Sequence, residues 1–123
     1  MKLIIIAAGS GKRLWPLTKN TPKSLILLDD GTTILERQIL NAVKSKLFNE
    51  IIIIVGYKHE QIEAKIVHYK NEINISTVYN PFFDVSNTIV SLWTACCRML
   101  EDDFMITNGD NIFREGVFNK ALD

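Results

Sequence analysis

The sequence predicts an α/β fold, a three-layer sandwich in which helices cover both faces of a mostly parallel central sheet. Three observations lead to this prediction. Short, branched apolar runs recur along the chain, and segments with helical periodicity separate them. The chain has 123 residues, 47% of them hydrophobic, which is enough for one domain with a buried core over residues 1–123. Strands that alternate with helices of this length form a parallel sheet with right-handed crossovers.

The first half of the chain contains two expected strands and the helix between them. Lys2–Ala7 (KLIIIA) and Glu50–Val55 (EIIIIV) are apolar on both faces, which is typical of strands buried inside a parallel sheet. Between them, Thr33–Phe48 carries apolar residues at three- and four-residue steps. This helix is expected to begin behind a threonine N-cap, either Thr32 or Thr33.

The second half repeats this alternation. His59–Asn71 carries one apolar stripe and is expected to be helical, whereas Ile75–Tyr79 alternates and should be a strand that is less buried on one face. A third helix is expected over Ser86–Leu100, with Trp93 facing the core. Asp103–Thr107 (DFMIT) is again apolar on both faces, which predicts a last buried strand.

Composition and charge argue against several classes of protein. There are 14 basic and 14 acidic side chains, so bulk charge favours neither nucleic acid nor an anionic membrane as a partner. Leu3–Ala8 ends in a loop rather than a signal-peptide cleavage site, and no run approaches the ~20 apolar residues that span a bilayer. The adjacent Cys96 and Cys97 suit neither a disulfide nor a zinc site, so we expect two free thiols in a reducing, cytoplasmic environment.

Polar or glycine-containing segments follow all four expected strands. They are Gly9–Arg13, Gly56–Tyr57, Asn80–Asn87 and Asn108–Asp110. The carboxyl ends of parallel strands meet at one edge of a sheet, and ligands of such sheets bind beyond that edge. The four segments are therefore predicted to form one site. Lys12 and Arg13 lie within the segment after the first strand, and Lys23 follows it. These cations indicate that the site binds an anion.

The first glycine loop fits neither of two common phosphate-binding patterns. A P-loop needs glycine where Ile6 stands, and serine or threonine where Arg13 stands. A dinucleotide-binding fingerprint needs a third small residue where Leu14 stands. Both patterns are therefore excluded.

The longer string AAGSGKRLWPLT, followed by PKSL, resembles the signature of nucleotidyltransferases that join a nucleoside triphosphate to a phosphorylated sugar or alcohol. This resemblance implies the Rossmann-like sandwich of the nucleotide-diphospho-sugar transferase type, truncated here to its nucleotide-binding part, with the acceptor-binding part absent. Lys12 departs from the pattern, which more often has threonine or serine there. The matching positions are Ala7, Ala8, Gly9, Gly11, Arg13, Leu14, Pro16, Leu17, Thr18, Pro22 and Lys23.

A second stretch, NPFFDVSNTIVSLW, is similar to a segment of bacterial phosphocholine cytidylyltransferases, although Thr88 stands where a second asparagine is common. The similarity implies CTP as the nucleotide and phosphocholine, or a similar phosphorylated alcohol, as the acceptor. Two alternatives stay open: a sugar-1-phosphate transferase that uses UTP, dTTP, GTP or ATP, and a non-catalytic nucleotide-binding module. The 123 residues alone are expected to bind nucleotide without turnover, and the oligomeric state is open.

Three side chains are the expected catalytic groups. The planar fork of Arg13 suits the β- and γ-phosphates, and the compact charge of Lys23 suits the α-phosphate and the incoming phosphoryl oxygen. Asp110 is expected to hold Mg²⁺ between the α-phosphate and the acceptor, unless Asn108–Asp110 is merely a turn. The family's second aspartate comes from much later in the chain and has no match here.

Backbone groups and uncharged side chains are expected to bind the rest of the nucleotide. Glycine permits close backbone approach, so the loop can cradle the triphosphate. Amide and hydroxyl groups can pair with a pyrimidine edge, although Ser86 could equally serve as a helix N-cap. The expected nucleotide-binding residues are Ala7, Ala8, Gly9, Ser10, Gly11, Lys12, Asn80, Ser86 and Asn87.

Four aromatic residues near this edge keep two interpretations each. Phe82 and Phe83 either hold a quaternary ammonium group by cation–π contact or pack a loop onto the sheet. Tyr57 either closes the base pocket or covers a strand end. Trp15 either shields the phosphates or packs within its loop.

Overall fold

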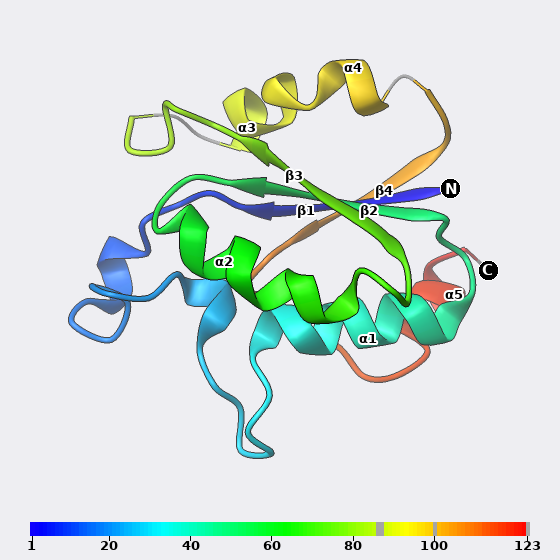
Figure 1. Ribbon diagram of the computed structural model, residues 1–123, viewed down its shortest axis with the longest axis horizontal. Helices are drawn as coiled ribbons and strands as arrows, with labels where there is room; N and C mark the ends of the chain where they lie inside the picture. The colour runs from blue at the N-terminus through cyan, green and yellow to red at the C-terminus, as the bar shows by residue number, and fades with distance from the viewer. Residues whose placement is uncertain (86–87, 100, 123) are drawn as a thin grey trace.

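The computed structural model describes residues 1–85, 88–99 and 101–122. Its sheet has four strands in the order β3-β2-β1-β4, and every neighbouring pair is parallel (Figure 1). The strands are β1 (Lys2–Ala7), β2 (Glu50–Val55), β3 (Asn74–Tyr79) and β4 (Phe104–Asn108). The predicted bounds of β1 and β2 are confirmed, whereas β3 and β4 each begin one residue away from the prediction.

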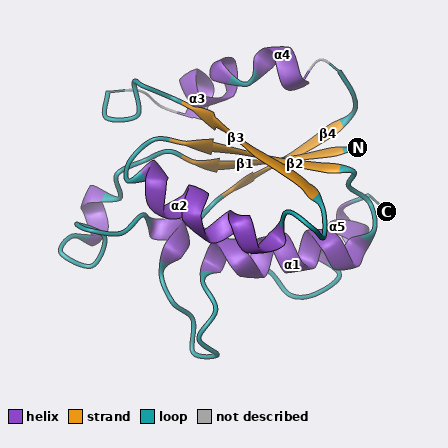
Figure 2. Cartoon of the chain, viewed as in Figure 1, coloured by secondary structure: helices purple, strands orange, loops and turns teal. Residues whose placement is uncertain are grey.

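Helices cover both faces of the sheet, which confirms the predicted three-layer α/β sandwich. On one face lie α1 (Ile34–Ser45), α2 (His59–Ile66) and α5 (Val117–Ala121), and on the other lie α3 (Thr88–Thr94) and α4 (Cys96–Met99) (Figures 1 and 2). The short 3₁₀ helices are η1 (Lys12–Leu14), η2 (Lys23–Leu25) and η3 (Val67–Tyr69). Within these described residues, no helix combines the length and the apolar character needed to cross a membrane.

The core lies on both faces of β1 and β2, because their branched side chains alternate between the two faces. Leu3 and Ile5 face α1, together with Ile51 and Ile53 of β2. Ile4 faces the opposite layer, where α3 and α4 lie. Every residue of β2 is buried. The two central strands thus form a rigid platform, and their carboxyl ends carry the predicted site.

Helix α1 is fixed at its start by a capping box. The Thr33 hydroxyl accepts a hydrogen bond from the Glu36 backbone N–H at 3.1 Å, and the Glu36 carboxylate accepts one from the Thr33 backbone N–H at 3.2 Å. Of the two threonines considered from the sequence, Thr33 is therefore the N-cap. The other Glu36 oxygen accepts a hydrogen bond from the hydroxyl of Tyr69 in η3.

The Tyr69 hydroxyl should make stability fall at alkaline pH. Burial and the hydrogen bond to Glu36 raise the pKa of Tyr69 to about 12, whereas an unfolded tyrosine has a pKa of about 10. The stability that the Tyr69 hydroxyl contributes is complete below pH about 10. Above that pH the unfolded state releases the proton that the folded state keeps, so this stability is lost as the pH rises through about 12. Urea unfolding at pH 8, 10 and 11.5 should therefore show Tyr69→Phe less stable than wild type by an amount that shrinks as pH rises. A pH-independent difference would contradict this assignment.

The helical layer over the α3–α4 face differs from the sequence prediction. The segment expected as one helix forms two short ones, and Ser91 and Ala95 face the sheet while Trp93 points away from it, 73% exposed. The prediction that Trp93 belongs to the core is wrong, because small side chains let this helix lie close to the sheet and turn the large indole outward. Ser86, the possible N-cap, and Asn87 and Leu100, which the predicted helix includes, lie outside the described residues.

Strand β4 is less buried than predicted. Phe104 and Ile106 are 41% and 44% exposed, whereas Thr107, on the other face, is buried against the α1 side. β4 is an edge strand of the described sheet: it pairs with β1 on one side and with no strand on the other. An apolar run alone does not distinguish a central strand from such an edge strand. In β3 only Ile75 is buried, and Ser76, Thr77 and Val78 are all of intermediate exposure, so the predicted alternation is not seen.

Candidate functional site

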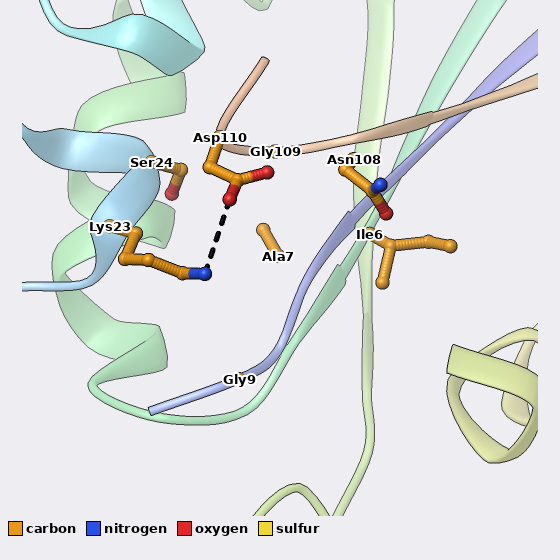
Figure 3. Close-up of a pocket in the computed structure, with 8 residues that line it drawn as sticks. All are labelled: Ile6, Ala7, Gly9, Lys23, Ser24, Asn108, Gly109 and Asp110. Carbon is orange, nitrogen blue, oxygen red and sulfur yellow. Dashed lines mark hydrogen bonds and ion pairs between the residues drawn. The ribbon is translucent and has the colours of Figure 1, made fainter. Parts of the chain in front are cut away.

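The strand order places a crevice between β1 and β4. The chain leaves β1 toward β2 on one side, and it returns from β3 through α3 and α4 to the other side of β1. Such a switch in direction opens a binding crevice at the carboxyl ends of the strands. A cavity of about 260 Å³ lies there, lined by the end of β1, by Lys23 and Ser24, and by the segment that follows β4 (Figure 3).

Lys23 and Asp110 meet in this cavity although 87 residues separate them in the chain. The Lys23 ammonium nitrogen lies 3.1 Å from an Asp110 carboxylate oxygen, and Figure 3 shows the two side chains directed toward each other. Their side chains are 36% and 42% exposed, so both can also contact a ligand. The structure therefore brings together two of the three predicted catalytic residues.

Two glycines permit the close approach of the segments that form the cavity. Gly11 has φ +65°, and a Cβ atom there would lie 2.8 Å from Cγ of Lys23. At Gly109 a Cβ would lie 2.9 Å from Cβ of Ala7, which would push the end of β4 away from β1. The fully buried Thr18 hydroxyl donates a 2.6 Å hydrogen bond to the Gly11 carbonyl oxygen and fixes the loop from below.

A second cavity of about 550 Å³ adjoins the first. Its lining includes the whole predicted anion loop from Ala8 to Arg13, together with Lys23, and Phe83 and Asp84 face the loop across it. The exposed Lys12 ammonium lies 3.5 Å from the Asp84 carboxylate. Arg13 is also exposed and lines the same cavity. The loop, with its cations Lys12 and Arg13, and Lys23 therefore line the same cavity.

Asn80, which is predicted to bind the nucleotide, lines neither cavity. Its side chain is fully buried, its amide nitrogen donates a 3.0 Å hydrogen bond to the Ser91 hydroxyl, and its carbonyl oxygen accepts a 2.9 Å bond from the Phe82 backbone N–H. Asn80 therefore ties the loop after β3 to helix α3. Ser86 and Asn87, the other side chains expected at the base, lie outside the described residues.

The aromatic side chains support the loops around the site. Tyr57 donates a hydrogen bond through its hydroxyl to the Lys19 carbonyl oxygen, and its ring centroid is 6.2 Å from that of Phe83. The Trp15 indole N–H donates a 3.4 Å hydrogen bond to the Ser10 carbonyl oxygen. Phe83 packs against Gly56, whereas Phe82 is 59% exposed. Tyr57 and Phe83 thus make packing contacts, and Phe82 presents its ring to solvent.

Sequence reasoning missed two side chains at the site. Gln38 of α1 hydrogen-bonds the backbone on both sides of Asp110, and the buried Ser24 hydroxyl in the first cavity has no hydrogen-bond partner in the described part of the chain. The available signal for Gln38 was a polar residue in the apolar stripe of a helix. Ser24 follows Lys23 directly but carries no spacing signal of its own.

The Asp110 carboxylate suits a magnesium ion that is also bound by phosphate groups. Among the described residues, no cluster of three or more histidine, cysteine, aspartate or glutamate side chains could hold a metal by itself. Magnesium is commonly bound through one or two carboxylates, with substrate phosphates and water completing its six ligands. The single carboxylate of Asp110, beside a loop suited to phosphates, matches that donor set.

Comparison with known proteins identifies similar chains. The family model described as nucleotidyl transferase matches residues 2–123. The choline-phosphate cytidylyltransferase of Streptococcus pneumoniae is 37% identical over 122 residues, which are 99% of this chain and 50% of that protein. The UTP–glucose-1-phosphate uridylyltransferase AglF of Haloferax volcanii is 34% identical over 121 residues, which are 95% of this chain and 46% of that protein.

A solved structure of CTP:phosphocholine cytidylyltransferase from Streptococcus pneumoniae is similar in fold, with a TM-score of 0.76 and 36% sequence identity. The superposition covers 93% of this chain and 47% of that one. The chain therefore spans about half the length of these relatives.

Proposed function

The chain belongs to the nucleotidyl transferase family, and on that premise we propose that residues 1–123 form the nucleotide-binding part of a Mg²⁺-dependent cytidylyltransferase. The substrates are CTP and a phosphorylated alcohol such as phosphocholine, and pyrophosphate is released. The observation that carries this proposal is the Lys23–Asp110 pair, which lies beside the Gly9–Arg13 loop in the crevice between β1 and β4.

The proposed reaction is one displacement at phosphorus. A phosphate oxygen of the acceptor attacks the α-phosphorus of CTP, the bond from that phosphorus to the oxygen bridging to the β-phosphate breaks, and pyrophosphate leaves with the bonding electrons. Positioning and charge neutralisation supply most of the catalysis in such transfers. No covalent intermediate with the protein is needed.

Each group at the crevice has a role in this displacement. Backbone N–H groups of the loop and the Arg13 guanidinium bind the β- and γ-phosphates, and the Lys23 ammonium neutralises the α-phosphate and orients the attacking oxygen. Asp110 holds the magnesium ion, which when bound neutralises charge that develops on the α-phosphate oxygens. Lys23 faces Asp110 at 3.1 Å, so both charged groups can contact the same magnesium-bound triphosphate.

Similarity to a choline-phosphate cytidylyltransferase supports CTP and an alcohol phosphate as the substrates. The choline-phosphate cytidylyltransferase of Streptococcus pneumoniae matches the chain over nearly its whole length. Sugar-1-phosphate uridylyltransferases match as well, so the choice of nucleotide is the point to test. The loop after β3, which Asn80 fixes to α3, is the segment we expect to select the base.

Isothermal titration of the 123-residue chain with CTP, UTP, dTTP, GTP and ATP in Mg²⁺ should show the tightest binding for CTP. We expect a preference of about 10-fold, because one or two hydrogen bonds to the base edge distinguish the nucleotides. A preference for another triphosphate would replace the cytidylyl assignment with the sugar-1-phosphate alternative. Binding of none of them would contradict the proposed function itself. The chain alone is expected to release no pyrophosphate from CTP and phosphocholine.

A further inference from the structure

Gln38 bridges the two ends of the turn that carries Asp110. Its side-chain nitrogen donates hydrogen bonds to the carbonyl oxygens of Asn108, at 2.8 Å, and Asn111, at 2.7 Å. The Asn111 backbone N–H also donates to the Asn108 carbonyl oxygen at 3.3 Å, which closes the turn over residues 108–111. Asp110 is the third residue of this turn. Both hydrogens of one amide group therefore hold the backbone on either side of the carboxylate.

Burying the Gln38 side chain costs free energy that an apolar residue at this position would not cost. Gln38 is fully buried in α1, which also carries the fully buried Leu35 and Ile39. Its amide oxygen is buried without a hydrogen-bond partner among the described residues. A buried polar atom left unpaired costs about 1–3 kcal/mol. An unbranched apolar side chain of similar length would fill the position without that cost, but it could not hold the turn.

We propose that Gln38 is a positioning residue, which fixes the Asp110 turn so that the carboxylate faces Lys23 and the incoming metal–nucleotide complex. This inference rests on the proposed function, because it assumes that Asp110 binds magnesium together with CTP. Gln38 itself contacts neither ligand. It acts through the backbone of residues 108–111, in the way that outer hydrogen-bond partners orient the direct ligands of metal sites.

Asn41 provides a matched control on the same helix. It lies three residues further along α1, is 4% exposed, and donates a 3.3 Å hydrogen bond from its side-chain amide to the Phe113 carbonyl oxygen. The bond is of the same kind, from the same helix to the same connection, but it lies beyond the Asp110 turn. Loss of the Asn41 bond should cost stability without moving Asp110.

The test measures how much Mg²⁺ increases the affinity for CTP. The dissociation constant of CTP is determined by titration calorimetry in Mg²⁺ and in EDTA, for wild type, Gln38→Met, Asn41→Leu and Asp110→Asn. We expect Gln38→Met to weaken binding about 10-fold in Mg²⁺, as outer-partner losses do, and to leave binding in EDTA unchanged. Asn41→Leu should resemble wild type in both conditions, and Asp110→Asn should abolish the gain from Mg²⁺.

A conservative variant keeps the test informative if Gln38→Met does not fold. In Gln38→Glu, burial should keep the carboxyl neutral, and its single proton can restore one of the two hydrogen bonds, so the gain from Mg²⁺ should lie between those of wild type and Asp110→Asn. If Asp110→Asn abolishes the gain while both Gln38 variants retain it in full, the inference is wrong and the proposed function stands. If wild type itself binds CTP equally in Mg²⁺ and EDTA, the proposed metal role of Asp110 fails and the inference fails with it.

Discussion

Replacing Lys23 with methionine should weaken the binding of CTP in Mg²⁺ by about 100-fold. A hydrogen bond to a charged group contributes about 1.5–3 kcal/mol, and each 1.4 kcal/mol corresponds to a factor of ten in affinity. The upper end of that range applies because Lys23 lines both cavities of the site, so its ammonium is expected to contact more than one phosphate oxygen. Titration calorimetry measures the effect directly.

Methionine is the informative replacement because the aliphatic part of Lys23 has a packing role. The Lys23 Cγ atom lies so close to Gly11 that a Cβ there would be only 2.8 Å away. A methionine keeps this contact and removes the charge. The control is Lys19→Met: Lys19 is exposed and lines neither cavity of the site. Equal affinities for Lys23→Met and Lys19→Met would exclude Lys23 from the nucleotide site.

The same variants distinguish binding from stability. The Lys23–Asp110 pair is partly exposed on both sides, and exposed ion pairs contribute about 0–1 kcal/mol to stability. Urea unfolding of Lys23→Met, Asp110→Asn and the double variant should therefore show small and nearly additive changes. A large effect on CTP affinity together with a small effect on unfolding would indicate that the two charges are placed for a ligand.

The sequence was sufficient for those parts of the fold that depend on local pattern. β1 and β2 have the predicted bounds because strands buried on both faces leave an uninterrupted apolar run. Strand order leaves no such local signal, so the exposure of Ile106 on β4 was not predicted. The prediction that Trp93 faces the sheet was wrong for a related reason. The small Ser91 of α3 and Ala95, which follows α3, face the sheet, whereas Trp93 is exposed.

The site was predictable in its location but not in its contacts. Topology alone placed Gly9–Arg13 and Asn108–Asp110 at the same edge of the sheet, and the nucleotidyltransferase resemblance is confirmed by the family match. The distance between Lys23 and Asp110, and the hydrogen bonds from Gln38, depend on how η2 and α1 lie against β4. Contacts between segments so far apart in the chain have no local sequence pattern from which they could be predicted.

Replacing Glu50 with glutamine should destabilise the fold, because it removes the most buried carboxylate of an ion-pair cluster. Glu50 begins β2 at the amino ends of the strands, away from the site, and is 8% exposed. Its carboxylate lies 3.1 Å from the ammonium of Lys2, which is 6% exposed, and it also pairs with Arg98. A neutral amide at position 50 would leave the Lys2 charge buried with less compensation. Urea unfolding at pH 7 measures the loss.

Glu101 offers a matched comparison because it contacts the same ammonium from the solvent side. Its carboxylate lies 2.6 Å from the Lys2 nitrogen, yet its side chain is 59% exposed. Glu101→Gln should therefore cost much less than Glu50→Gln, since water can replace a partner at the surface but not in the interior. Both variants should keep the wild-type affinity for CTP when folded, because the strands separate this cluster from the crevice. Equal losses of stability in the two variants would show that burial does not determine how much each carboxylate contributes to stability.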